Sequence, residues 1–549
     1  MKPRACIPTA LLLVLALLAC GAAAQDAGSA SIRALAAQAA AAPRAPRAYD
    51  ERSWLSRFYA VRGYTPAWTG QQRAQALELL ADAPAQGLAP DDYDLPALER
   101  QAQEAGDPAG FDAALTRAML RYLAELRFGR VRSDYFTNPP DARLAEFDPV
   151  ETLRAALAAG RPADAVAAAE PRFPLYAPVR AALAHYRELA RHKLRAVPAP
   201  VAALEPGAPY AGAAALEARL ELLGDLEAEE APPGKIYDQR LAEGVRHFQS
   251  RHGLEPDGVL GPATVGALQV PLKQRVRQLE LTLERLRWPP DFAPGRLIAV
   301  NVPGYRLWAW NSAAPGAQAE LEMRVIVGAA VKTPTPLFIG HMRYLDFHPY
   351  WNVPRSILLK EMIPKLRRSP SYLDNNDMEL YPVGGGAVTR VVNGATLAAL
   401  EAGRYRLRQR PGPKNALGAV KFVLPNPMDI YLHSTPDREL FQRTRRDLSH
   451  GCIRVEEPVA LAQFVLADAP EWTLERIQAA MAPGPMRRVP LPAVVPVLLL
   501  YATAITDRAG RVLFVRDVYG RDPLLEKALA GRTAEPEAQI VPAPEPPRE

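Results

Sequence analysis

The chain has 549 residues with a hydrophobic content of 49%, which is too long for one core and apolar enough for several. Its formal net charge of +6 is mild for this length. No arginine-rich arm or basic–aromatic pattern accompanies that charge, so the composition argues against a nucleic-acid-binding class.

The first residues have the pattern of an export signal. Lys2 and Arg4 precede an apolar run from Ala10 to Ala19, and an Ala-x-Ala pattern ends at Ala24. We therefore expect a signal peptide over 1–24 and a mature protein outside the cytoplasm. Cleavage there leaves Cys452 as the only cysteine, which excludes an intramolecular disulfide. Two alternatives are a lipidated Cys20 and an uncleaved signal, and either would give a membrane-associated protein.

The next segments predict a linker and then a helical domain. Residues 25–47 are rich in alanine and proline and lack helix caps, so they are predicted to be a linker. Residues 48–200 show apolar side chains at helical spacing, for example Leu115, Met119, Tyr122 and Leu126. Four prolines between Ala196 and Pro209 mark the boundary of this domain.

Residues 210–272 predict a compact unit of three helices. Asp238 is a candidate N-cap, Gly253 a candidate helix end, and Pro262 fits the first turn of the third helix. With its run VRHFQSRHGLEPDGVLGPATVGAL, this unit resembles the peptidoglycan-binding domain of cell-wall enzymes. The alternative is a helical spacer without a binding role.

From residue 290 the period changes from helical to strand. We expect a mainly-β domain over 290–482, interrupted by a long insertion at 354–412 that contains Gly384, Gly385 and Gly386. Insertions of this length at the edge of a domain are often lids, and we expect this one to be mobile. Residues 483–532 are predicted to add strands that pack on this domain, and 533–549 to be a disordered tail.

The stretch Ile430–Val455 carries the candidate chemistry. It reads IYLHSTPDRELFQRTRRDLSHGCIRV and contains Cys452, His433 and His450. A cysteine near histidines is typical of a nucleophile with its base, or of a metal site. Alternate residues of a strand share a face, so Tyr431 pairs with His433, and His450 with Cys452, if their segments are extended. Gly451 allows a tight backbone whose N–H groups face an oxyanion.

The two motifs His433-Ser434-Thr435 and Ser449-His450-Gly451-Cys452-Ile453-Arg454 resemble the signature of the L,D-transpeptidase catalytic domain of the YkuD type. The order of segments resembles the large Gram-negative members, and the resemblance covers nearly all of the mature chain. It implies a multidomain α+β protein: a helical scaffold domain, the three-helix wall-binding module, and a β-sandwich-like catalytic domain with a capping insertion that opens near Trp351.

The family resemblance also implies the roles of residues. Cys452 is the nucleophile and His433 the general base and acid, with no cofactor and no metal. Ser449, His450, Gly451 and Tyr431 are expected to shape the pocket, and Arg454 and Trp351 to contact substrate. Ser434 stands where the family often has glycine, which leaves the catalytic pair intact.

The implied activity is the formation of 3–3 cross-links between peptidoglycan stem peptides, in the periplasm, through a cysteine thioester that carbapenems can also form. The alternatives for the same site are attachment of a lipoprotein to the wall and hydrolysis as a carboxypeptidase or endopeptidase. Stem peptides are the expected partners, together with other wall-synthesis enzymes or a wall-anchored lipoprotein, and no nucleic acid.

Two further classes stay open at this point. One is a zinc protein that uses Cys452, His433, His450 and either His341 or His348, although paired ligand spacings are missing. The other is a wall-binding scaffold without activity. Single residues also have structural interpretations: Tyr431 as packing, His450 as a residue that holds the loop, and Arg454 as the partner of Glu456 or Glu457.

Overall fold

The computed structural model describes residues 26–43, 49–104, 106–131, 146–193, 195–229 and 234–531. The predicted signal peptide and tail lie outside these residues. The chain forms two compact units. The first comprises the described residues of Met1–Arg191, Leu272–Asp291 and Arg521–Gln539, and the second comprises those of His192–Pro271 and Phe292–Gly520. Within the described part of the chain, no helix is both long and apolar enough to cross a bilayer.

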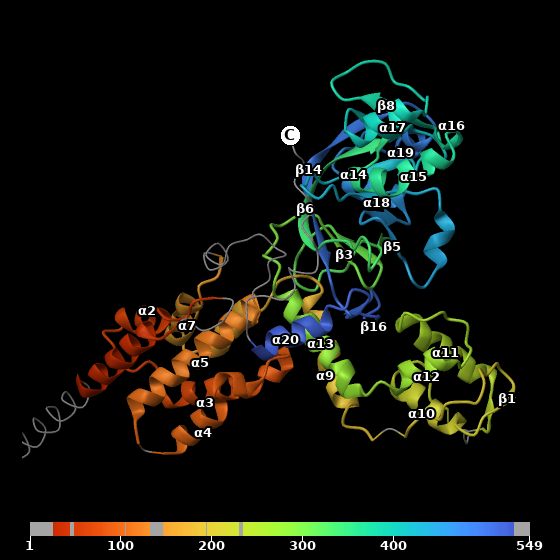
Figure 1. Cartoon of the computed structure of the whole chain (residues 1–549). Coiled ribbons are helices and arrows are strands. Elements are labelled where there is room, and N and C mark those ends of the chain that lie inside the picture. Colours follow the sequence, from red (N-terminus) through yellow and green to blue (C-terminus); the bar gives the residue numbers. More distant parts are fainter. Residues whose placement is uncertain are drawn as a thin grey trace, which may run out of the picture. The chain divides into compact units, whose positions relative to one another are not determined.

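The first unit is helical (Figure 1). Its longest helix is α5 (Pro108–Phe128), which begins at Asp107, whose side chain accepts a hydrogen bond from the Gly110 amide, and ends at Gly129 with φ +84°. The face predicted from Leu115, Met119, Tyr122 and Leu126 is confirmed, because all four side chains are buried. The remaining elements up to residue 189 are α2 (Trp54–Ala60), α3 (Gly70–Ala81), η1 (Ala83–Gln86), η2 (Pro90–Tyr93), α4 (Leu95–Gln103), α7 (Pro149–Ala158), α8 (Pro162–Ala169) and α9 (Tyr176–Leu189).

Two segments of this unit differ from the prediction. Residues 26–41 are helical, so the linker predicted for 25–47 is wrong there. Alanine is the best helix former, and Ile32 and Ala36 are buried, so packing replaces the missing caps. The unit also includes α13 (Leu272–Leu286) and α20 (Asp522–Gly531), which contact each other although they are far apart in the sequence. The prediction that 483–532 contains only strands on the catalytic domain is therefore wrong for α20.

The predicted three-helix module is confirmed in the second unit. Its helices are α10 (Ala213–Leu222), α11 (Gln239–Arg251) and α12 (Pro262–Gln269), beside a short pair of strands, β1 (Ala208–Pro209) and β2 (Ile236–Tyr237). The Asp238 carboxylate caps α11 by accepting a 2.8 Å hydrogen bond from the Leu241 amide. The helices share one core, whose buried members include Leu216, Leu220, Leu241, Val245, Phe248, Val265 and Leu268.

The mainly-β domain is built on one sheet of nine strands, in the order β12-β5-β13-β11-β10-β6-β14-β3-β4. Because β4 also pairs with β5, eight of these strands close into a continuous ring and leave few free edges. The strands are β3 (Leu297–Asn301), β4 (Arg306–Trp310), β5 (Leu321–Gly328), β6 (Phe338–Phe347), β10 (Val420–Val423), β11 (Leu432–His433), β12 (Asp447–Ser449), β13 (Ile453–Val455) and β14 (Arg487–Leu500). The helices α18 (Pro458–Val465) and α19 (Leu474–Met481) follow β13.

The position of β14 corrects the predicted domain end. We expected residues 483–532 to pack on a domain that ended at 482, whereas β14 lies inside the sheet between β6 and β3. Its register shifts between Pro490 and Val495, an irregularity that accommodates prolines in a central strand. The hairpin of β15 (Ala504–Thr506) and β16 (Val512–Phe514) follows it.

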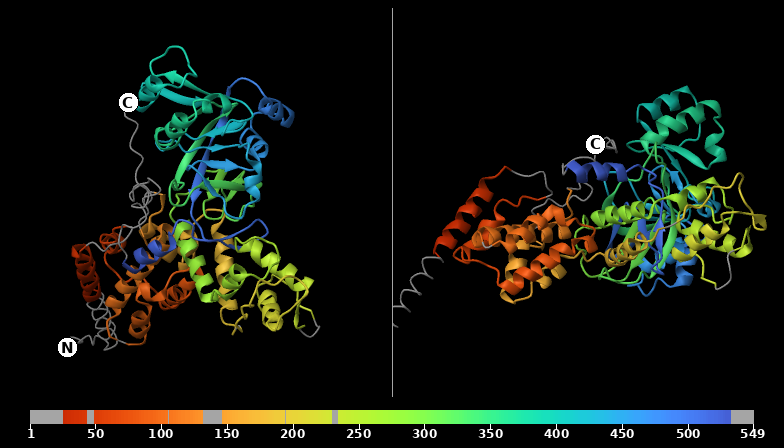
Figure 2. Two further views of the ribbon diagram at one scale, coloured as in Figure 1. Left: turned by 45° about the vertical axis from the view of Figure 1, so that its right-hand side comes forward. Right: turned by 90° about the horizontal axis from the view of Figure 1, so that it is seen from below.

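The insertion between β6 and β10 folds as a small body of its own. It contains β7 (Trp351–Asn352), α14 (Arg355–Ile357), the π-helix η3 (Leu358–Met362), α15 (Ile363–Arg368), α16 (Tyr372–Asn375), β8 (Met378–Pro382), α17 (Gly394–Glu401) and β9 (Tyr405–Gln409). Its strands form a three-stranded sheet in the order β7-β9-β8. Figures 1 and 2 show these elements gathered beyond one end of the long strands β6 and β14.

Candidate active site

The candidate residues lie on three neighbouring strands and the loops that follow them. β11 pairs with β10 on one side and with β13 on the other. In these registers Lys421 faces His433, and His433 faces Arg454, so the three side chains share one side of the sheet. Cys452 directly precedes β13 beside Tyr431, whose carbonyl accepts a hydrogen bond from the Ile453 amide at 3.1 Å. The sheet thus brings together Cys452, His433 and Tyr431, as the alternation predicted for Tyr431 and His433.

The loop that carries Cys452 is fixed by hydroxyl groups. The Ser449 hydroxyl donates to the Cys452 carbonyl at 2.6 Å, and the Thr335 hydroxyl donates to the Gly451 carbonyl at 2.8 Å. Gly451 has φ +113°, a conformation that favours glycine. A Cβ on Gly328 would lie 2.9 Å from the Gly451 Cα and 2.0 Å from the Thr333 carbonyl oxygen. The strand end at Gly328 and the nucleophile loop are therefore in backbone contact.

Cys452 is a thiol in the resting site. Its Sγ lies 3.5 Å from the Asp429 carbonyl oxygen, which accepts the thiol hydrogen. Burial raises the pKa of Cys452 to about 11, although hydrogen bonds from Tyr431 and the positive charge of Lys421 favour the thiolate. A thiol in this state attacks a carbonyl group only if a base takes its proton.

His433 is buried and held in the form that a base requires. Its Nδ1 donates to the Ser434 carbonyl at 2.6 Å, which leaves the lone pair on Nε2. Burial, and then the positive charges of Arg454 and Lys421, lower the pKa of His433 to about 3. The imidazole is neutral near pH 7 and can accept a proton.

Ser434 is fixed from both sides, which explains its place next to the base. Its amide donates to the Val420 carbonyl at 2.9 Å, and its hydroxyl accepts from the Val420 amide and donates to the Leu417 carbonyl, both at 3.1 Å. A Cβ on Gly418 would lie 2.2 Å from the Ser434 hydroxyl. The carbonyl that orients His433 is thus part of a closed hydrogen-bond network.

Three family models match this chain. The "L,D-transpeptidase catalytic domain" matches residues 295–482, the "Putative peptidoglycan binding domain" residues 211–268, and the "Scaffold domain" residues 53–183. The chain carries an L,D-transpeptidase catalytic domain. The resemblance seen in the two motifs is confirmed, as are the helical region, the wall-binding module and the mainly-β fold.

Curated and solved relatives were also compared. A Haemophilus influenzae protein named "Putative L,D-transpeptidase" is 34% identical over 249 residues, which are 45% of this chain and 48% of that protein. The chain thus spans about half the length of the curated relative it matches. An L,D-transpeptidase structure from Xylanimonas cellulosilytica is 15% identical, covering 55% of this chain and 98% of that one, with a TM-score of 0.17. A fused Zn-dependent amidase/peptidase/peptidoglycan-binding protein from Clostridium acetobutylicum is 12% identical, covering 54% and 98%, with a TM-score of 0.15.

Other predicted residues of the catalytic domain have partners inside the protein. The Gly451 amide donates to the Ser449 hydroxyl at 3.2 Å and is therefore occupied. The Cys452 amide has no acceptor among the described residues, so of these two amides it is the one that can donate to an oxyanion. Arg454 forms a 2.9 Å ion pair with Asp437, rather than with Glu456 or Glu457. Glu456 instead pairs with Arg324.

Two predicted residues involve the insertion. Trp351 packs against the insertion's own apolar core. His450 is exposed, and its Nε2 lies 2.7 Å from the Glu361 carboxylate in the π-helix η3. His450 therefore brings the nucleophile loop into contact with the insertion, and π-helical turns are frequent at functional sites.

Sequence reasoning missed the residues that support the catalytic domain's site from a distance. Thr335 and Tyr519 hold Gly328 and the nucleophile loop: the Tyr519 hydroxyl donates to the Gly328 carbonyl at 2.6 Å and accepts from the Thr335 amide at 3.1 Å. Lys421 was also missed, although a lone lysine in the apolar run Val420–Leu424 is a usable signal. Among the described residues, no group of three or more His, Cys, Asp or Glu side chains is arranged to hold a metal ion.

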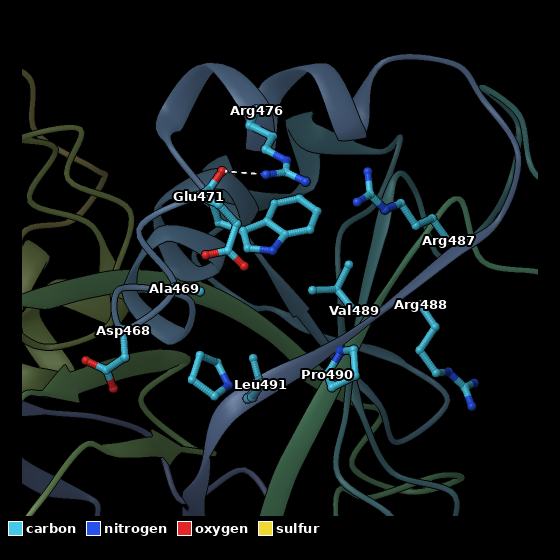
Figure 3. Close-up of a pocket in the computed structure, with 11 residues that line it drawn as sticks. Asp468, Ala469, Glu471, Arg476, Arg487, Arg488, Val489, Pro490 and Leu491 are labelled. Carbon is cyan, nitrogen blue, oxygen red and sulfur yellow. Dashed lines mark hydrogen bonds between the residues drawn. The ribbon is translucent and has the colours of Figure 1, made fainter.

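A separate cavity of about 580 Å³ lies between the turn that precedes α19 and strand β14 (Figure 3). One of its lining residues is Trp472, which stacks on Phe347, and the guanidinium groups of Arg476 and Arg487 lie 4.9 and 4.8 Å from the Trp472 ring centroid. None of the predicted site residues lines it. The cavity is therefore not the binding site for the group that reacts at Cys452.

Proposed function

We propose that the protein is a peptidoglycan L,D-transpeptidase that forms 3–3 cross-links through a thioester on Cys452. One observation carries the proposal: Cys452 lies on the same side of the sheet as a neutral, oriented His433, in a domain of the L,D-transpeptidase family. The wall-binding module at residues 211–268 supports peptidoglycan as the substrate.

The first half-reaction consumes the donor stem peptide. His433 Nε2 takes the thiol proton as Sγ attacks the carbonyl carbon of the third residue, and the Cys452 amide donates to the resulting oxyanion. The intermediate collapses when the C–N bond to the terminal D-alanine breaks. His433 returns its proton to that leaving amine, and a thioester remains.

The second half-reaction uses an amine of another stem peptide. The amine attacks the thioester carbonyl, His433 accepts a proton from the amine, and the C–S bond breaks. The thiolate that leaves is reprotonated by His433, so both the enzyme and its protons are restored. If water enters in place of the amine, the same sequence gives hydrolysis.

The pKa values indicate when the proton moves. With the pKa of Cys452 near 11 and that of His433 near 3, the neutral thiol and imidazole are the stable pair at rest. Proton transfer therefore accompanies the attack and does not precede it. No hydrogen bond joins Sγ to the imidazole, and such contacts often tighten only when substrate binds.

The reaction takes place outside the cytoplasm, in the periplasm, under this proposal. The pattern of Lys2, Arg4 and the apolar run before Ala24 supports export. The N-terminus of the mature protein, sequenced after expression in a Gram-negative host, tests this point.

The test of the activity is incubation with purified wall tetrapeptides and analysis of the products by mass. We expect a cross-linked product, free D-alanine and a transient adduct on Cys452. Cys452→Ala should remove product and adduct, including the adduct with carbapenems, while His433→Ala should slow both steps severely. His341→Ala, an exposed histidine on β6, is the matched control and should behave as wild type. Product formed by Cys452→Ala would refute the proposal.

A further inference from the structure

A row of ionisable side chains crosses the catalytic sheet. In the strand registers Arg488 faces Asp346, Asp346 faces Lys421, Lys421 faces His433, and His433 faces Arg454. Residues that face each other on adjacent strands project to the same side. The row therefore runs from β14 across β6 and β10 to His433 on β11 and Arg454 on β13.

Lys421 is the one cation of this row that has no anionic partner. Asp346 is engaged by Arg488, whose Nε donates to its carboxylate at 2.8 Å, and Arg454 is engaged by Asp437 at 2.9 Å. Among the described residues, no carboxylate lies within 4 Å of the Lys421 ammonium. Instead, Nζ lies 3.8 Å from the centroid of the Tyr431 ring. A partly buried cation without a counter-ion is costly, so its position calls for an anion.

The reaction itself supplies an anion on this side of the sheet, because Cys452 becomes a thiolate when its thiol loses the proton. Tyr431, whose ring contacts Lys421, lies beside the Cys452 segment, because its carbonyl accepts a hydrogen bond from the Ile453 amide at 3.1 Å. The strand registers place Lys421 and Cys452 on the same side of the sheet as this tyrosine. We propose that Lys421 is the electrostatic partner of the nucleophile, and that it stabilises the negative charge that develops on Sγ during attack. This inference deepens the proposed function, because it assigns a charge to the same site.

The two cations beside His433 then have different tasks. Arg454 is the leading charge that keeps His433 unprotonated, whereas Lys421 is the cation whose charge favours the Cys452 thiolate. Arg454 keeps the base available, and Lys421 assists the departure of the thiol proton. Burial in turn lowers the pKa of Lys421, which the neighbouring Cys452 and Asp346 oppose.

The test measures the thiol without any wall substrate. The full chain is treated with iodoacetamide, a small neutral probe, between pH 7 and 10. The adduct is followed by mass on the peptide Asp447–Arg454, so Cys6 and Cys20 do not interfere. The charged and titratable groups that face Lys421 or Cys452 are Asp346, Arg488, Asp429, Tyr431, His433 and Arg454, and all of them are kept in the variants of Lys421.

Loss of the Lys421 charge should raise the pKa of Cys452 by about one unit, so Lys421→Met should react about tenfold more slowly at each pH below the pKa. Lys421→Arg keeps the charge and should recover most of the rate. Lys527→Met removes an exposed cation on helix α20, outside this row, and is the control, expected to match wild type. If Lys421→Met does not fold, as shown by its near-UV circular dichroism, Lys421→Gln is used in its place.

Three outcomes would overturn the inference. The first is an iodoacetamide rate that is unchanged in Lys421→Met. The second is equal loss in Lys421→Met and Lys421→Arg, which indicates shape or proton transfer and not charge. The third is an unchanged iodoacetamide rate combined with a raised KM for the donor peptide, which assigns Lys421 to a substrate carboxylate. Because the probe needs no peptidoglycan, failure here is distinct from failure of the proposed activity.

Discussion

The nucleophile loop and the insertion are held in opposite ways. Gly451 and its neighbours are fixed by backbone contact with Gly328 and by the buried hydroxyl groups of Ser449 and Thr335. The insertion has its own sheet and its own apolar core, and Glu361 of the insertion lies 2.7 Å from Nε2 of the exposed His450 in the nucleophile loop. A rigid catalytic loop and a separately folded cover can therefore change independently, and mutations in the two regions should differ in kind.

The largest effect on the acylation rate is expected at Gly328, where the backbone of the nucleophile loop leaves no room for a Cβ. In Gly328→Ala, the new Cβ would lie 2.0 Å from the Thr333 carbonyl oxygen and 2.9 Å from the Gly451 Cα, so backbone must move. Displacements of about 1 Å cost on the order of 100-fold in rate, so we expect carbapenem acylation to fall at least that far. The measurement is the rate of adduct formation by intact mass.

Gly394→Ala in helix α17 of the insertion is the matched control, because a Cβ there meets nothing within 4 Å. It should acylate at the wild-type rate. Wild-type acylation in Gly328→Ala would show that the loop is not fixed by this contact.

The second effect is a pH profile that reports the burial of His433. With a pKa near 3, the imidazole stays neutral down to about pH 4, so acylation by a carbapenem should be nearly constant from pH 7 to pH 5. A histidine with an ordinary pKa of about 6.5 would lose roughly 30-fold over that interval. Arg454→Gln should move the acidic limb to higher pH, because Arg454 is the leading charge on the ring.

The same shift has a consequence for stability. In the unfolded chain His433 is protonated below about pH 6.5, whereas in the folded chain it is protonated only below about pH 3. The free energy of unfolding therefore carries no penalty from His433 above about pH 6.5, and it decreases through this group as the pH falls from 6.5 towards 3. For the acylation profile, a carbapenem acylation rate that declines around pH 6.5 in the wild-type protein would contradict a buried, neutral His433.

Local sequence patterns predicted part of the fold and of the site, whereas features that depend on contacts between distant segments could not be predicted. The strands from Leu297 to Phe347 followed from their β-branched and aromatic runs, and Cys452 and His433 from their motifs. The closed ring of strands, the central place of β14 and the row through Lys421 depend on registers between distant segments. The helix at 26–41 was missed because its stability comes from burial of Ile32 and Ala36.

A third effect tests the hydroxyl network of the loop. Thr335→Val keeps the shape of the side chain but leaves the buried Gly451 carbonyl and Gly328 amide without their 2.8 Å partners. Each lost bond of this kind costs about 1–3 kcal/mol, so the acylation rate should fall about tenfold and the melting temperature should drop. Thr335→Ser retains the hydroxyl and should recover both. Equal loss in the two variants would assign the effect to packing.

The smallest effect is expected at the contact between His450 of the nucleophile loop and Glu361 of the insertion. Glu361→Gln keeps the side-chain shape but removes the carboxylate that His450 contacts at 2.7 Å and that Lys365 approaches at 3.9 Å. Exposed polar contacts of this kind contribute about 0–1 kcal/mol, so donor kcat/KM should change by only about two- to fivefold. Glu401→Gln, which breaks an ion pair with Arg367 inside the insertion, is the matched control and should leave kcat/KM unchanged.

Hydrogen exchange distinguishes two roles for the insertion that His450 contacts through Glu361, namely a mobile cover and a fixed part of the fold. If the insertion is a mobile cover, amides in 354–412 exchange quickly in the free enzyme and slowly once Cys452 is acylated. Glu361→Gln should then reduce the protection gained on acylation around residues 358–368, while Glu401→Gln should retain it. Equal exchange in the free and acylated states would instead identify the insertion as a fixed part of the fold. In that case the contact of His450 with Glu361 would serve only to orient the nucleophile loop.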